Sequence, residues 1–271
     1  MRRSIPKSPT PAPRAAPTPT LPADLPPLHG PIRHTSRVAV GRRIQLDSAA
    51  VEALRFRQVN VSEAFTLQDS DGGFFRASLL SCGSRGAEAE VYEAMARPPE
   101  SPLRLSLVCA VLGRQRMIFV SQKATELGVD RILPVFTERS VGPEGLDHEK
   151  AHAWPGQAVR ASRQCRRATV PEVRPTLPLA EALDGDVWRA AGARFFLDDA
   201  AAETARLQPG VRSACLAVGP EGGWTDEEKQ LLLAAGAAPL NLGGRVLRAE
   251  TAVVVGLALL QHRLGDLARE P

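Results

Sequence analysis

Two glycine-rich loops near the end of the chain constrain its fold more than any other feature. The first, residues 219–223, reads Gly-Pro-Glu-Gly-Gly and follows the apolar run 214–218; the second contains Gly243 and Gly244. Glycine permits positive φ and lets the backbone approach a ligand with no Cβ in between. Because such loops at the carboxyl ends of strands form the crevice of an open α/β sheet, we expect the binding site there.

Strands and helices are expected to alternate from residue 103 onward. The apolar pattern predicts strands over 103–112, 132–136, 194–197 and 214–218, and helices over 115–127, 158–167, 178–183 and 250–261. Gly128 ends the first of these helices as a C′ glycine. Thr225 and Glu228 form a capping-box pattern that begins another helix. This alternation indicates an α/β domain with a mostly parallel sheet over residues 103–271.

The preceding segment, residues 32–97, has short β-like runs instead. They lie at 38–40, 43–46, 64–67 and 74–80, with the hairpin signal Asp71-Gly72-Gly73 before the last of them. A short helix over 48–58 carries Arg55 and Arg57, which lie either on a phosphate-contacting face or on a solvated rim. We expect a small β-barrel domain, separated from the α/β domain by the stiff linker 98–102.

Composition sets further limits. Residues 1–31 hold ten of the 23 prolines, so we expect a disordered tail there. The net charge of +4 permits a polyanionic partner without requiring one. Cys109 and Cys215 lie in apolar runs and the four cysteines form no C-x-x-C pair, which favours reduced core thiols and a cytoplasmic location. No apolar run reaches the roughly 18 residues of a membrane span.

Several familiar motifs are missing: the sequence has no G-x-G-x-x-G after a strand, no P-loop and no G-x-S-x-G. His148 and His152 have no third ligand nearby and fit an exposed helix face, so we expect no metal. Arg245 and Arg248 begin the last, apolar helix. If they are buried or half-buried, such arginines need an anionic partner, which can be a glutamate of the chain, a phosphate or a carboxylate ligand. The alternative is an ion pair with a purely structural role.

Four sequence blocks together resemble the RsmE-type 16S ribosomal RNA uracil-N3 methyltransferases of the SPOUT superfamily. They are QKATELGV at 122–129, QCRRATVPE at 164–172, GPEGG at 219–223 and LGGRVLRAET at 242–251. The resemblance covers about residues 103–267. It implies a PUA-like β-barrel RNA-binding domain followed by a SPOUT α/β domain with a deep trefoil knot. It further implies a homodimer that acts on 16S ribosomal RNA in the small subunit.

The resemblance implies S-adenosylmethionine as cofactor and N3 of a uridine as methyl acceptor. Its implied cofactor site comprises Leu197, Gly219, Pro220, Glu221, Gly222, Leu242, Gly243, Val246, Leu247, Arg248 and Thr251. We hypothesise that Arg248 stabilises negative charge on the uracil and that Glu250 or Glu221 accepts its proton. Phosphate contacts are expected from Arg55, Arg57, Arg160, Arg163, Arg166 and Arg167.

The chain departs from the pattern of that family at several positions, and these changes touch the pocket walls and the RNA face. Ile118 and Arg163 stand where acidic residues are usual, and Asp198-Asp199 replaces His-Pro. These changes leave two alternatives: a non-catalytic RNA-binding protein that serves as an assembly scaffold, or a methyltransferase for a different RNA uridine. Calorimetry with S-adenosylmethionine separates the scaffold from the enzymes.

Overall fold

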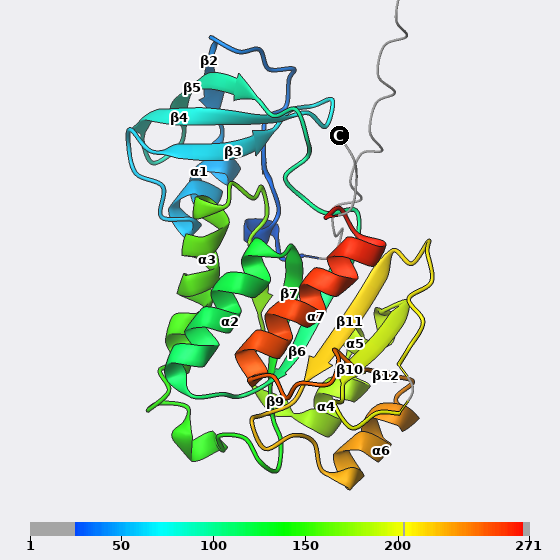
Figure 1. Ribbon diagram of the computed structural model, residues 1–271. Coiled ribbons are helices and arrows are strands. Elements are labelled where there is room, and N and C mark those ends of the chain that lie inside the picture. The colour runs from blue at the N-terminus through cyan, green and yellow to red at the C-terminus, as the bar shows by residue number, and fades with distance from the viewer. Residues whose placement is uncertain (1–24, 203, 268–271) are drawn as a thin grey trace, which may run out of the picture.

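A computed structural model describes residues 25–202 and 204–267. The chain forms two sheets, a smaller one from the N-terminal segment and a larger one from the remainder. In Figure 1 the smaller sheet lies at the top and the larger sheet lies below it. Most of the expected disordered tail lies outside the described residues. The short 3₁₀ helix η1 (Pro27–His29) falls within its last part, where the ring of His29 lies 4.9 Å from that of Phe56. The disorder expected up to residue 31 is therefore wrong for this last part.

The smaller sheet contains five strands in the order β1-β3-β4-β5-β2. Its elements are β1 (Ile32–Arg33), β2 (Arg43–Leu46), α1 (Ser48–Phe56), β3 (Ala64–Gln68), β4 (Phe74–Cys82) and β5 (Ala87–Ala94). The hairpin expected at Asp71-Gly72-Gly73 joins β3 to β4, which pair antiparallel. Among the described residues β1 and β2 remain edge strands, so the sheet is a half-barrel that α1 covers.

One strand expected in this domain does not form. Residues 38–40 lie outside any strand, because the chain turns at Gly41, which has φ +82° and donates its amide to the carbonyl of Val91. Conversely, β5 had no separate prediction, although it is central to the sheet. Its alternating pattern of buried alanine and valine with exposed glutamate carries only a weak apolar signal.

The larger sheet is entirely parallel, in the order β12-β10-β11-β6-β7-β8, with β9 also on β7. The strands are β6 (Arg104–Ala110), β7 (Val129–Phe136), β8 (Glu172–Val173), β9 (Leu177–Pro178), β10 (Ala193–Leu197), β11 (Ser213–Val218) and β12 (Ala238–Leu240). The helices are α2 (Arg114–Glu126), α3 (Trp154–Gln164), α4 (Leu179–Asp184), α5 (Asp186–Ala190), α6 (Asp226–Ala234) and α7 (Ala249–Leu264), with 3₁₀ turns η2 (Pro143–Gly145) and η3 (Ala151–Ala153).

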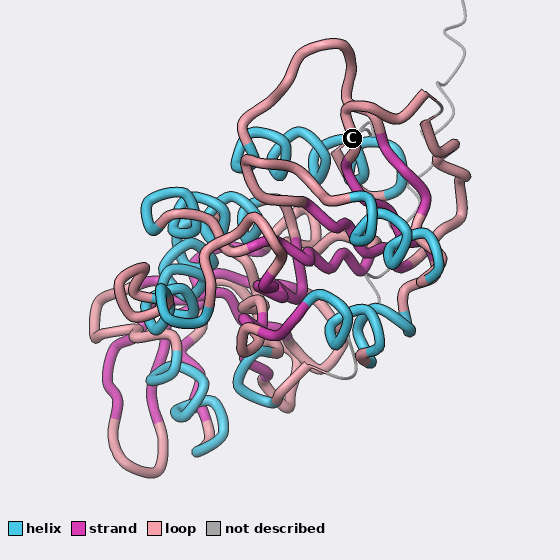
Figure 2. The backbone as a smooth tube through the Cα atoms, turned by 90° about the horizontal axis from the view of Figure 1, so that it is seen from below, coloured by secondary structure: helices cyan, strands magenta, loops and turns pink. Residues whose placement is uncertain are grey.

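Helices cover both faces of this sheet, which Figure 2 shows running between them. On one face α2, α3 and α7 bury Met117, Trp154 and Leu257 against β6 and β11. On the other face α4, α5 and α6 bury a second cluster that includes Trp188 and Leu232. The expected α/β architecture is thus confirmed. The strands have few polar residues because both of their faces are buried.

Local end signals position the helices as expected. Thr225 accepts a hydrogen bond from the amide of Glu228, and the Glu228 carboxylate accepts one from the amide of Thr225, which completes the capping box of α6. Gly128, just past α2, has φ +77°. Pro155 lies in the first turn of α3, where its missing N–H costs no helical hydrogen bond, so the helix begins earlier than predicted. Over the described residues no helix is long and apolar enough to cross a bilayer.

Candidate active site

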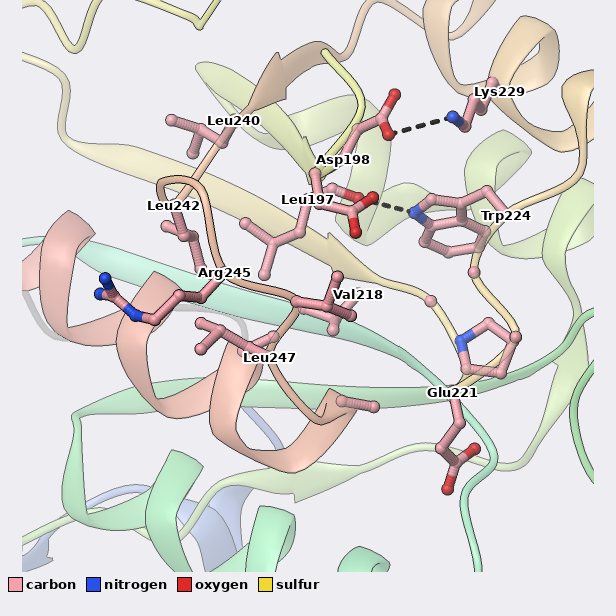
Figure 3. A pocket seen from close by; sticks show the side chains of 18 of the residues that line it. Leu197, Asp198, Val218, Glu221, Trp224, Lys229, Leu240, Leu242, Arg245 and Leu247 are labelled. Atoms are coloured by element: carbon pink, nitrogen blue, oxygen red, sulfur yellow. Dashed lines mark hydrogen bonds and ion pairs between the residues drawn. The ribbon is translucent and has the colours of Figure 1, made fainter.

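A cavity of about 300 Å³ opens at the carboxyl ends of β10 and β11. Its walls come from the ends of these strands, from loop 219–223 and from segment 242–249, as Figure 3 shows. Both glycine loops therefore line one cavity, although β12 and α6 separate them in sequence. This position, outside the carboxyl ends of parallel strands, is where ligands bind in open α/β sheets.

The backbone of both loops requires glycine. Gly243 has φ +106° and Gly223 has φ +70°, in a region that other residues rarely adopt. At Gly219 a Cβ would lie 3.0 Å from the indole of Trp224, so the glycine allows that ring to pack on the loop. The indole Nε1 donates to the carbonyl of Leu197 at 3.0 Å, which ties loop 219–223 to the end of β10.

A second tie comes from the loop that follows β7. The Arg139 guanidinium donates to the carbonyl of Gly222 at 2.8 Å, and the amide of Glu138 donates to the Glu228 carboxylate at 2.8 Å. The first glycine loop is thus held both by the end of β10 and by the loop after β7. The resulting rigidity favours a binding site whose backbone groups are fixed before a ligand arrives.

Apolar side chains form the interior of the cavity. Leu197, Leu242 and Leu247 lie around it in Figure 3, together with Val218 and Leu240. Nine of the expected cofactor residues line it: Leu197, Gly219, Pro220, Glu221, Gly222, Leu242, Gly243, Val246 and Leu247. Arg248 and Thr251 do not. Arg248 is the exposed N-cap residue of α7, and Thr251 is exposed on its first turn.

Charged side chains lie at the edge of the cavity. The Lys229 ammonium pairs with Asp198 at 3.0 Å, and both residues line the wall. Glu221 points away from the cavity in Figure 3 and pairs with Arg116 of α2. The Arg116 Nε also lies 3.8 Å from Glu250 Oε2. Glu221 and Glu250, the two candidate proton acceptors, therefore share the cation of Arg116. Arg116 was not singled out from the sequence.

The arginines expected to contact RNA divide into two groups. Arg57, only 5% exposed, donates to the carbonyls of Leu28, Gly30, Ala53 and Ala168, and burial lowers the pKa of its guanidinium to about 10. Arg167 is also buried and donates to Glu100, Thr169 and the carbonyls of Thr125 and Val129. Their hydrogen bonds are internal, so neither residue is free to contact a phosphate, contrary to expectation.

The remaining arginines of that set reach the surface. Arg55 is exposed and donates to the carbonyl of Gly83. Arg163 pairs with Glu63 at 2.7 Å across the junction of the two domains, and the neighbouring Arg166 lies 3.7 Å from Glu93. Arg160 belongs to the same helix face, and together with Arg163 it borders a shallow groove at the junction.

The departures at Arg163 and Asp198 each have an opposite charge beside them, namely Glu63 and Lys229. Both replacements are therefore accommodated as ion pairs. Sequence reasoning missed Trp224, Lys229, Arg116 and Arg139 as residues of the site or its supports. Trp224 directly follows the first glycine loop and could have been found by that position; the other three become visible only in the fold.

Within the described residues no cluster of three or more histidine, cysteine or acidic side chains has a metal-binding arrangement. All four cysteines are free. Burial raises the pKa of Cys109 and of Cys215 to about 12, as expected for core thiols that remain protonated and unreactive.

The comparisons with known proteins agree with this site. A family model described as the RNA methyltransferase domain matches residues 99–261, which identifies the class as RNA methyltransferases. Ribosomal RNA small subunit methyltransferase E of Mycobacterium bovis is 32% identical over 213 residues, covering 76% of this chain and 80% of that protein. The Synechocystis protein of the same name is 30% identical over 223 residues, covering 78% of this chain and 69% of its own length.

A solved structure extends the likeness to the whole fold. The crystal structure of a ribosomal RNA small subunit methyltransferase E from Neisseria gonorrhoeae, bound to S-adenosyl methionine, is 31% identical with a TM-score of 0.64. The match covers 88% of this chain and 100% of that chain. The chain belongs to the ribosomal RNA small subunit methyltransferase E family.

Proposed function

We propose that this protein transfers a methyl group from S-adenosylmethionine to N3 of a uridine in 16S ribosomal RNA. The observation that carries the proposal is the single cavity formed by both glycine loops at the carboxyl ends of β10 and β11. The family membership supports the RNA substrate. Two similar structures, from Neisseria gonorrhoeae and Legionella pneumophila, are described as bound to S-adenosyl methionine or SAM.

The residues of the cavity fit this cofactor. A volume of about 300 Å³ lies at the lower end of the range for small-molecule sites, and the walls combine apolar side chains with polar and charged groups. Leu197, Leu242 and Leu247 would pack on the faces of the adenine ring. The backbone of the second glycine loop would supply hydrogen bonds, because a Cβ built at Gly243 or Gly244 would meet no other atom within 4 Å.

The chemistry required of the protein is modest. The bound cofactor supplies an activated methyl group on a sulfonium. Glu250, at the start of α7, would accept the proton of uracil N3, and Arg248 would stabilise the negative charge that develops on a carbonyl oxygen beside it. The rigid loops would hold the acceptor in line with the methyl group, and this positioning supplies much of the acceleration. Thr251 would complete the cofactor site from the first turn of α7.

We further propose that the RNA lies across the junction of the two domains. The accessible cations of the predicted set would contact phosphates, and these are Arg55, Arg160, Arg163 and Arg166. The half-barrel would then serve as the PUA-like RNA-binding domain. Each phosphate contact makes binding weaker as salt concentration rises.

Two features of the expected architecture remain part of the proposal. A trefoil knot is supported by the path of the last segment, which leaves the edge strand β12 and returns as α7 to pack on β11 and α2 at the centre of the sheet. A homodimer is supported by apolar side chains left exposed on α2, on α7 and in the second glycine loop. These are Phe119 on α2, Val246 in the second loop and Val255 on α7, and Val246 is 85% exposed.

Two measurements test the function. Calorimetry with S-adenosylmethionine should show one site per chain; no binding would favour the scaffold instead. Mass spectrometry of 16S ribosomal RNA from a strain lacking the gene should show one uridine without its N3-methyl group, and adding the gene back should restore it. An unchanged 16S ribosomal RNA together with a lost methyl group elsewhere would point to a different RNA substrate.

A further inference from the structure

Arg116 connects the two segments that form the cavity. It lies in the first turn of α2, and its guanidinium pairs with Glu221 of the first glycine loop. On its other side the Nε lies 3.8 Å from Oε2 of Glu250, at the start of α7. Ala249 and Ala252, on either side of Glu250, line the cavity. Of the three charged residues, Glu221 lines the cavity, whereas Arg116 and Glu250 lie beside residues that line it. They come from three different elements.

The Glu250 carboxylate is incompletely satisfied. Its side chain is 17% exposed, and its Oε2 is buried and accepts no hydrogen bond from the described residues. A separation of 3.8 Å from Arg116 Nε gives electrostatic attraction without a hydrogen bond. Leaving a buried carboxylate oxygen without a donor costs free energy, so this oxygen is suited to accept a hydrogen bond from a ligand.

The Arg116 guanidinium has N–H donors that its pairing with Glu221 does not use. A guanidinium carries five N–H groups, and the pairing with Glu221 uses only part of them. The side chain is 41% exposed, so the rest of the guanidinium is accessible from solvent. An unsatisfied acceptor and an accessible donor thus lie side by side at the edge of the proposed methyl-donor cavity.

We propose that Arg116 and Glu250 together recognise the Watson–Crick edge of the target uracil. Uracil presents an N3–H donor between two carbonyl acceptors. Glu250 Oε2 accepts the N3–H, Arg116 donates to one neighbouring carbonyl, and the second carbonyl is left for Arg248. Cytosine has an acceptor at N3 and a donor at N4, so the contact to N3 would be mismatched, and so would the arginine contact that falls on the 4-position. The assignment rests on the proposed function and adds to it the residue pair that selects uracil.

The same contacts serve the reaction. The N3 proton moves to the Glu250 carboxylate, and the electron pair of N3 forms the new bond to the methyl carbon. The bond between that carbon and sulfur breaks, and its electron pair stays on sulfur. Positive charge near the carbonyl that Arg116 contacts stabilises the uracil as it loses its proton. Arg116 therefore acts both in recognition and in catalysis.

Arg116→Met tests the proposal, with Arg114→Met as the matched control. Arg114 is exposed in the same turn of α2, and no ion pair of its side chain with Glu221 or Glu250 is found among the described residues. The assay uses small subunits isolated from a strain lacking the gene and measures N3-methyluridine by mass spectrometry. Arg116→Met loses the hydrogen bond to a uracil carbonyl and a stabilising charge, so its kcat/KM should fall about 100-fold or more. The Arg114→Met control should keep the wild-type value.

Three further measurements decide between a role toward uracil and a structural one. Calorimetry should give Arg116→Met wild-type affinity for S-adenosylmethionine; a large loss would show that Arg116 only supports the donor site and would overturn the proposal. Arg116→Lys keeps the charge but loses the fork-shaped donor pattern, so it should recover part of the rate. Glu250→Gln should reduce transfer while cofactor affinity is retained.

Two other outcomes are equally clear. Arg116→Met methylating at the wild-type rate would overturn the assignment while leaving the proposed function intact. Wild-type protein that binds S-adenosylmethionine but methylates no uridine N3 would overturn the proposed function, and this assignment with it. The first outcome concerns the variant alone and the second the wild type, so the two failures are distinguishable.

Discussion

The Arg167 guanidinium donates to the Glu100 carboxylate at 2.8 Å from Nη2 and 3.1 Å from Nε, with both side chains buried. Glu100 lies in the linker between the domains, and Arg167 lies just after α3. The same carboxylate accepts the amides of Ala168 and Thr169 at 2.8 and 2.9 Å. This pair fixes the linker against the segment that contacts the half-barrel, where Thr66 donates to the carbonyl of Arg166.

Removing Arg167 should therefore destabilise the whole protein. Arg167→Met leaves Glu100 buried without its cation, and such a change costs about 3–5 kcal/mol. Urea denaturation measures the free energy of unfolding. Arg166→Met is the matched control, since Arg166 is exposed and its pairing with Glu93 is loose at 3.7 Å. Equal stability of both variants would show that the buried pair has no special importance.

Asp130, 3.7 Å from Arg167, makes stability depend on pH. Burial raises the pKa of Asp130 from 3.8 to about 7, although Arg167 opposes the shift. The folded state thus holds a proton that the unfolded state releases, so this stabilising contribution is present below about pH 4 and is lost as pH rises to about 7.

Asp130→Asn should remove that contribution. Between pH 4 and 7 the stability of the wild type should fall relative to the variant, by at most about 1.4 kcal/mol per pH unit. Denaturation curves of both proteins at several pH values measure the difference. Parallel pH profiles would show that Asp130 ionises in the same range whether the chain is folded or unfolded.

The two glycines of the second loop should respond differently to alanine. Gly243 has φ +106°, whereas Gly244 has no positive φ, and at neither position would a Cβ meet another atom within 4 Å. Gly243→Ala should distort the loop at a cost of about 1–3 kcal/mol. Calorimetry should show weaker binding of S-adenosylmethionine to Gly243→Ala and unchanged binding to Gly244→Ala. The reverse order would contradict the role assigned to the backbone.

Binding of small-subunit RNA should depend on the accessible arginines of the domain junction. Arg166→Ala should weaken binding at low salt and reduce the slope of log K against log salt by about 1, as expected when one phosphate contact is lost. Arg189→Ala removes the same charge from an exposed side chain of α5, on the opposite face of the sheet, and serves as control. Identical slopes for the two variants would place the RNA elsewhere.

The sequence predicted the secondary-structure elements better than it predicted the environments of individual side chains. The Thr225–Glu228 capping box and the glycine loops are encoded by neighbouring residues, so the elements around them followed from sequence. The burial of Arg57 depends on the packing of residues 25–31 and 166–170 against α1, which no local pattern contains. The role inferred for Arg116 likewise depends on three elements that meet only in the fold. Long-range packing, rather than residue type, decides which arginines are free.

The composition of the cavity wall has a consequence for synthesis of the protein. The wall extends in sequence from Leu197 to Ala252, so its last side chains belong to α7. The half-barrel can fold while later residues are still being added, since its strands pair within residues 32–94. A nascent chain therefore cannot complete the methyl-donor cavity until α7 has been synthesised, and premature termination ahead of α7 would leave a protein without the last wall of that cavity.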